Sequence, residues 1–112
     1  MNEAKIPIIV GGGQVTESQS DVLLAQSPMD LIAQAGRKAA SDSGTGDRLL
    51  KILDTIVVVR AFSDTSWRFA CPFGRYSNPP LSLAKRLGAT KANQLVYTYS
   101  GGNMPQWCVN RI

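Results

Sequence analysis

The chain has 112 residues, of which 44% are hydrophobic and 18% are charged, and its formal net charge at pH 7 is +4. The hydrophobic fraction excludes a disordered chain, and the length leaves room for a single domain. The Lys and Arg residues are scattered, never more than two together, so the positive charge does not favour a nucleic-acid partner. No apolar run approaches the roughly 18 residues of a membrane helix, and the start lacks the apolar core of a signal peptide. We therefore expect a cytoplasmic location and no membrane partner.

The first apolar run, residues 6–10 (IPIIV), predicts a short buried strand, and Gly11-Gly12-Gly13 turn the chain out of it. The glycines resemble part of a dinucleotide-binding fingerprint. However, the third glycine of GxGxxG is missing, and a polar loop (residues 16–26) follows instead of a helix. A flexible turn is the simpler interpretation of these glycines, and phosphate binding is the alternative.

A helix is predicted next, with Ser27 as its N-cap and Pro28 at its first position. Its apolar face is narrow and rich in alanine, which would allow close approach to a sheet or to another helix. Ser43-Gly44 end this helix. A short helical turn over residues 47–52 then leads into the next strand.

The second predicted strand covers residues 55–59 (TIVVV), an unbroken β-branched run. Such a run is typical of a strand that is covered on both faces, as in a parallel or mixed central sheet. Residues 60–80 then form an irregular stretch that is too long for an ordinary connection in a compact domain.

Pro79-Pro80 introduce a further helix, which Gly88 closes at the C-cap position. Residues 95–99 (LVYTY) predict a third strand, and the turn Ser100–Gly102 ends it. Asn103 and Gln106 stand where a capping box opens a last helix. Strands and helices thus alternate, which indicates an α/β layered fold with a mixed or parallel sheet.

The candidate nucleophiles are two cysteines, Cys71 and Cys108, and the sequence contains no histidine. The two cysteines lie in unlike contexts, and neither belongs to a CxxC motif. These counts exclude a structural zinc site and a Cys–His pair within the chain.

A set of motifs resembles the N-terminal part of thiolase-like proteins, usually labelled acetyl-CoA acetyltransferases, close to the sterol-carrier-protein thiolase branch. The resemblance covers nearly the whole chain, and its most specific part is GGN-x-PQ after the last predicted strand. The matching segments, in chain order, are IPIIVGGGQVTE, SPMDLIAQAGRKAASDSG, LDTIVVVRAFS, WRF, NPPLSLAKRLGA and SGGNMPQWCVN.

The resemblance implies that residues 1–112 are an incomplete N-terminal thiolase-like domain, with a truncated layered fold. Members of the family are several times longer, so we expect the chain to end inside the helix that starts at the catalytic centre in thiolases. In the full-length parent the resemblance implies an acyl-CoA thioester as substrate, no further cofactor and a homo-oligomer. The activity of the family is acyl transfer to acetyl-CoA.

In catalytic thiolases this turn carries a nucleophilic cysteine at the helix N-terminus, where the helix dipole favours a thiolate. Here the matching position falls on Gly102 or Asn103, and neither side chain can take an acyl group. Cys108 lies more than a turn further along and is better interpreted as a buried thiol, and Cys71 as a loop residue. We therefore assign no catalytic residue and expect the isolated chain to be inactive.

Binding is the role that the turn could still fill, through Gly101, Gly102 and Asn103 as substrate-binding residues. The glycines leave backbone free to approach a thioester, and the N–H groups of the helix start suit its oxygen. The simpler alternative is that the glycines only permit a tight turn. Trp67 and Arg68 are interpreted as packing residues of the loop, with acyl-CoA contacts as the alternative.

A second interpretation of the whole chain is a small stand-alone α/β module for binding or interaction. The two hypotheses differ in what they predict for the apolar strands. Strand edges and a helix face without a covering layer tend to associate, so the incomplete thiolase-like domain is expected to self-associate.

Overall fold

The computed structural model describes residues 6–17, 21, 23–61, 68, 71 and 74–111. This part of the chain contains four helices and two strands. In chain order they are α1 (Pro28–Asp42), α2 (Asp47–Ile52), β1 (Thr55–Val58), α3 (Pro79–Leu87), β2 (Gln94–Tyr97) and α4 (Met104–Arg111). None of these helices combines the length and the apolar character that crossing a membrane requires.

The boundaries of α1 and α3 follow the predicted stop and start signals. Ser27 caps α1, and its Oγ accepts a hydrogen bond from the amide of Asp30 at 3.2 Å. Asn78 caps α3 in the same way through the amide of Leu81. Gly88 ends α3 with a left-handed backbone (φ 72°), a conformation that glycine adopts without steric cost.

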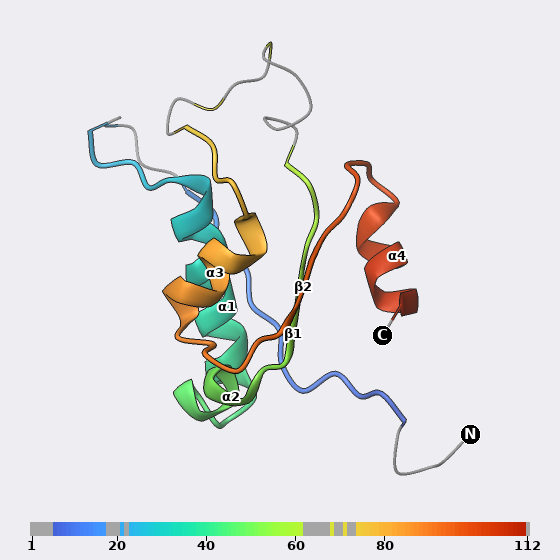
Figure 1. Cartoon of the computed structure of the whole chain (residues 1–112). Coiled ribbons are helices and arrows are strands. Elements are labelled where there is room, and N and C mark those ends of the chain that lie inside the picture. The colour runs from blue at the N-terminus through green and yellow to red at the C-terminus, as the bar shows by residue number, and fades with distance from the viewer. Residues whose placement is uncertain are drawn as a thin grey trace.

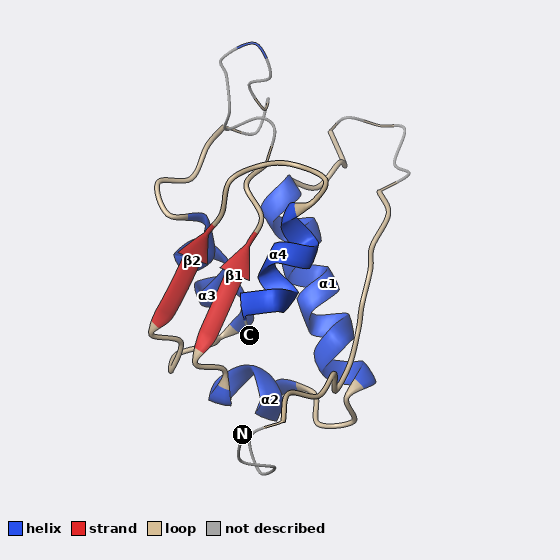
Figure 2. Cartoon of the chain, turned by 90° about the vertical axis from the view of Figure 1, so that its right-hand side faces the viewer, coloured by secondary structure: helices blue, strands red, loops and turns tan. Residues whose placement is uncertain are grey.

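The two strands pair in parallel, with Thr55 opposite Gln94 and Val58 opposite Tyr97. Helix α3 lies on the crossover between them, as a parallel pair requires. Figure 1 shows α1 and α3 on one side of the strands and α4 on the other, and Figure 2 shows the strands side by side. The α/β class and the parallel pairing are thus confirmed.

The core lies between the strands and the α1–α3 layer. It comprises Met29, Ala33, Ile56, Val58, Leu83, Ala84 and Ala89. Ile56 and Val58 point into this core, whereas Thr55 and Val57 are exposed on the opposite face. The prediction that this strand is covered on both faces is therefore wrong for the described residues, because α4 does not close over the outer face.

The strand predicted over residues 6–10 is also absent, and these residues lie in an extended path outside the sheet. Ile8 is 78% exposed and Ile9 is 93% exposed. The following glycines lie against α1, which directs the segment away from β1. A contact with a helix has replaced the expected pairing with a strand.

The contact of this segment with α1 is made by backbone. A methyl group added at Gly11 would lie 2.4 Å from the carbonyl oxygen of Ala39, and one added at Gly13 would lie 2.5 Å from that of Ala35. The amide of Gly12 donates to Oδ2 of Asp42 at 3.0 Å, near the end of the helix. Gly11 and Gly13 are therefore needed for close approach, and the role predicted for them as a turn is replaced by packing.

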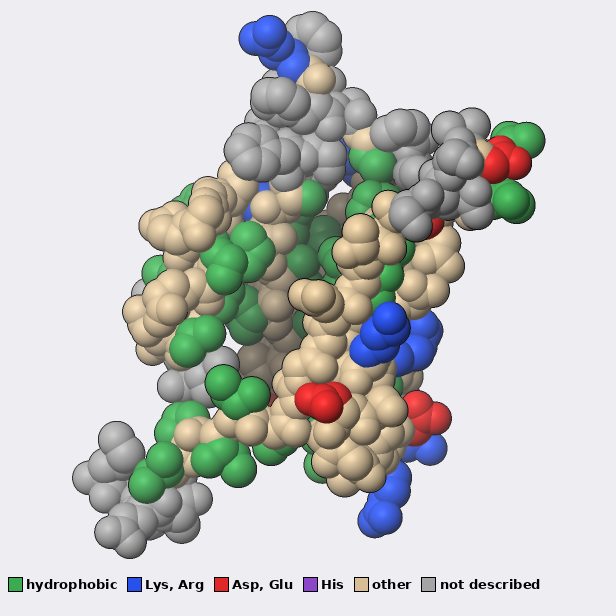
Figure 3. Space-filling model, turned by 180° about the vertical axis from the view of Figure 1, so that it is seen from behind, with side chains coloured by type: hydrophobic (Ala, Val, Ile, Leu, Met, Phe, Trp, Pro, Cys, Tyr) green, Lys and Arg blue, Asp and Glu red, His purple; other side chains and the backbone are tan. Residues whose placement is uncertain are grey.

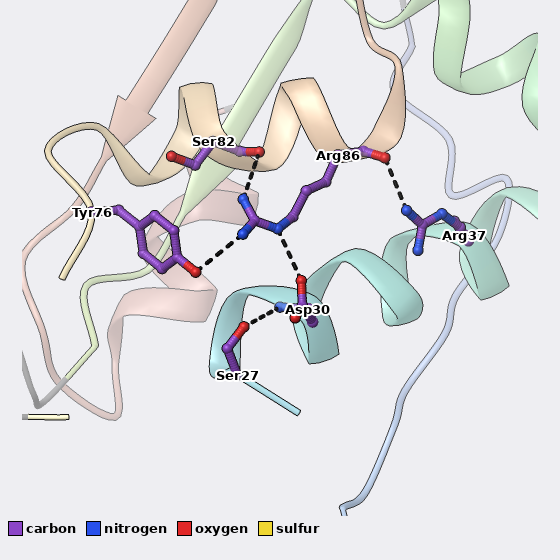
Figure 4. Close-up of polar contacts among 6 residues, drawn as sticks. All are labelled: Ser27, Asp30, Arg37, Tyr76, Ser82 and Arg86. Atoms are coloured by element: carbon purple, nitrogen blue, oxygen red, sulfur yellow. Dashed lines mark hydrogen bonds and ion pairs between the residues drawn. The ribbon is translucent and has the colours of Figure 1, made fainter. Parts of the chain in front are cut away.

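An ion pair joins α1 to α3 at the edge of the core (Figure 4). Nε of Arg86 lies 3.0 Å from Oδ1 of Asp30. The same guanidinium donates to the hydroxyl of Tyr76 at 3.1 Å, and Arg37 donates to the carbonyl of Arg86 at 2.9 Å. The hydrogen bond from Arg86, and then the one from the side chain of Ser27, lower the pKa of Asp30 from its ordinary value of 3.8.

Replacing Gly13 tests the backbone contact with α1. We expect Gly13→Ala to lower the free energy of unfolding by roughly 1–3 kcal/mol, because the methyl group would overlap the backbone of α1. Gly12→Ala is the matched control, since a methyl group there meets nothing within 4 Å. Urea unfolding followed by circular dichroism measures both, and equal stability of the two variants would contradict the contact.

The ion pair predicts a pH-dependent contribution to stability. Because the folded-state pKa of Asp30 is lowered, its contribution is present above the ordinary pKa and is lost as the pH falls through the lowered value. Asp30→Asn should therefore destabilise the chain at pH 7 and make little difference at a pH well below 3.8. Urea unfolding at both pH values, with Asp47→Asn on α2 as control, measures this. A destabilisation by Asp30→Asn that does not change with pH would show that the carboxylate charge is not involved.

Candidate functional site

The candidate site lies at the carboxyl ends of the two parallel strands. In open parallel sheets, ligands bind in crevices at this edge, because the loops that follow neighbouring strands meet there. Here residues 59–61 follow β1, and residues 98–103 follow β2 and lead into α4 (Figure 1). The sequence motif GGN-x-PQ thus stands at the edge of the sheet where a ligand is expected.

A cleft of about 260 Å³ opens between this edge and the first turns of α4. Its lining is mostly aromatic and apolar, with a single charged side chain among the described residues. The lining residues are Arg60, Val96, Tyr97, Thr98, Tyr99, Met104 and Trp107. Tyr99 is 82% exposed and Trp107 is 37% exposed, so part of each ring lies at the surface of the cleft.

Arg60 connects the two strand ends. Its Nε donates to the carbonyl oxygen of Thr98 at 3.1 Å, and its guanidinium carbon lies 4.6 Å from the centroid of the Tyr97 ring. The amide of Ala61 donates to the Tyr97 hydroxyl at 3.4 Å. These contacts hold the residues after β1 against the end of β2.

The three predicted substrate-binding residues lie together in the turn beside this cleft. Gly101 has φ 146° and needs glycine, whereas Gly102 has no positive φ and a methyl group added there meets nothing within 4 Å. Gly102 and Asn103 are exposed at the surface. Positive φ in this turn therefore belongs to Gly101 and not to Gly102.

The predicted capping box of α4 does not form. Nε2 of Gln106 donates to Oδ1 of Asn110 at 3.0 Å, one turn further along the helix. No hydrogen bond involves the side chain of Asn103 in the described part of the chain. The amide of Trp107 instead donates to the carbonyl oxygen of Asn103 at 3.2 Å, within the first turn.

The two cysteines lie in different places, and neither lines the cleft. Cys108 lines a groove of about 870 Å³ between the outer face of the strands and α4, together with Val57, Val96 and Val109. Figure 3 shows apolar side chains around the hollow that separates α4 from α1. Cys71 lines a cavity of about 60 Å³ on the other side of the strands, with Met29 and Tyr76. The cysteines are half-buried free thiols, which agrees with roles in packing.

The two remaining candidates from the sequence are Trp67 and Arg68. Trp67 lies outside the described residues, and Arg68 is exposed. Sequence reasoning missed Arg60 and Trp107 as cleft residues. The position of Arg60 directly after an apolar strand was the available signal, since the carboxyl ends of parallel strands meet at one edge.

No known protein family, curated protein or solved structure matches the chain. Within the described ranges, no group of His, Cys, Asp and Glu side chains is arranged to hold a metal ion. The chemistry of the site is therefore inferred from its own residues.

The conformation of the turn predicts that alanine lowers stability more at Gly101 than at Gly102. Gly101→Ala should lower the free energy of unfolding by roughly 1–3 kcal/mol, because alanine is strained at positive φ. Gly102→Ala should leave stability nearly unchanged, since its position is open. Thermal and urea unfolding of both variants measure the difference. A larger loss at Gly102 would contradict the assignment of positive φ to Gly101 alone.

Proposed function

We propose that the chain is the N-terminal segment of a thiolase-like acyltransferase and that its turn 100–103 contributes to binding an acyl-CoA thioester. The observation that carries the proposal is the position of the GGN-x-PQ turn, at the carboxyl edge of a parallel strand pair and before a helix. This geometry agrees with the place that the resemblance gives to the thioester.

The surroundings of the turn support a binding role. The exposed backbone at Gly102 leaves room for a ligand, and the adjoining cleft offers aromatic and apolar surface for an acyl group. A cleft of about 260 Å³ lies just below the usual range of small-molecule pockets, which suits a short acyl group better than a whole cofactor.

Catalysis by these residues alone is not part of the proposal. The position at the start of α4 where thiolases carry the nucleophile holds glycine and asparagine, and the sequence has no histidine to act as a base. Cys108 does not line the cleft but lines the neighbouring groove, which shares Val96 and Trp107 with the cleft. Acyl transfer by the parent protein would need groups from outside this chain.

A second candidate function is a stand-alone interaction module. The exposed outer face of the strands, with Val57 and Val96 each 37% exposed, favours it. The groove beside that face has a volume of about 870 Å³, compared with about 260 Å³ for the cleft at the turn. This alternative places the functional surface on the groove and not at the turn.

Calorimetric titration with acetoacetyl-CoA separates the two functions. Gly102→Val should weaken binding at least about tenfold, or about 1.4 kcal/mol, because its side chain would occupy the space beside the turn. Cys108→Ala should bind as the native chain does, and no variant should cleave the thioester. Circular dichroism checks that each variant is folded.

Two results would contradict the proposal. If folded Gly102→Val bound normally while Cys108→Ala lost binding, the ligand would lie in the groove. If the native chain bound no thioester and formed a dimer in size-exclusion chromatography, the interaction module would be the better function.

A further inference from the structure

Arg60 has donor capacity that its protein contacts do not use. A guanidinium carries five N–H donors, and here only Nε has an acceptor, the carbonyl oxygen of Thr98. The terminal nitrogens Nη1 and Nη2 have no hydrogen-bond partner in the described part of the chain. The residue is nevertheless half-buried, and its position is fixed by the Tyr97 ring.

Among the described residues, no carboxylate lines the cleft to neutralise Arg60. The other lining side chains of the described residues are apolar, aromatic or hydroxylated. The nearby ion pair of the fold, Asp30 with Arg86, joins α1 to α3 and does not line the cleft. Among the described residues, no carboxylate competes with an external anion for Arg60.

We propose that Arg60 is an anion-binding residue of the cleft, and that it takes a carboxylate or phosphate group of a ligand whose apolar part lies against Trp107 and Met104. The guanidinium fork matches two oxygens of such a group, which a lysine in the same place could not do. That the ligand is a CoA thioester rests on the proposed function. That Arg60 binds an anion does not rest on it.

A CoA thioester has two sources of such an anion. One is a terminal carboxylate on the acyl group, and the other is the phosphates of CoA. Glutaryl-CoA, pentanoyl-CoA and pentanoyl-pantetheine separate them, because the first has both anions, the second only phosphates and the third neither. Free glutarate and pyrophosphate serve as probes that contain no thioester.

The test is calorimetric titration of the full 112-residue chain with the three thioesters. We expect the native chain to bind the ligand that carries the recognised anion at least tenfold more tightly than the next ligand in the series. Arg60→Gln should remove this preference, and Arg60→Lys should reduce it. Arg48→Gln, which removes the same charge from the exposed face of α2, is the matched control and should keep the preference.

The outcomes distinguish this inference from the function on which it partly rests. Equal binding of all three thioesters by the native chain, or equal preference in folded Arg60→Gln, overturns the anion site and leaves the thioester function standing. If no thioester binds, but glutarate or pyrophosphate shifts the NMR signals of Trp107 in the native chain and not in Arg60→Gln, the thioester function fails and the anion site stands. If no probe binds, both are overturned.

Discussion

Parallel pairing of β1 with β2 places the carboxyl ends of both strands at one edge of the sheet. It also requires a crossover that runs from the end of β1 back to the opposite edge, where β2 begins. Helix α3 lies on that return and packs against α1, so the same crossover builds the core and leaves the carboxyl edge open. Arg60 and the turn before α4 become neighbours only because of this arrangement. Antiparallel pairing would have put them at opposite ends of the strands.

Local signals in the sequence were sufficient to predict where the helices α1 and α3 begin and end. Ser27, Asn78 and Gly88 act through hydrogen bonds and backbone conformations within a few residues, and such effects do not depend on the rest of the fold. The capping box at Asn103 is the exception, because Gln106 has a competing partner one turn ahead. A residue pattern cannot decide between two partners of similar geometry.

The misassigned strands have a different cause. An apolar, β-branched run shows that a segment suits a strand, but whether a partner lies beside it is a tertiary property. Residues 6–10 pair with no described strand, and the glycines that follow them lie closely against α1. The outer face of β1 is exposed, since α4 stands off from it across the groove. For the candidate site, the sequence pointed to the turn but not to Arg60, which only the parallel pairing of the strands brings near it.

Backbone attachment also leaves Ile8 and Ile9 without packing partners among the described residues. Contacts through Gly11, Gly12 and Gly13 hold the segment on α1, while Ile8 and Ile9 extend into solvent. The side chains of Ile8 and Ile9 therefore do not contribute to the packing of the described core. Polar residues at these two positions should reduce self-association in samples for spectroscopy, while the helix layer and the cleft stay unchanged.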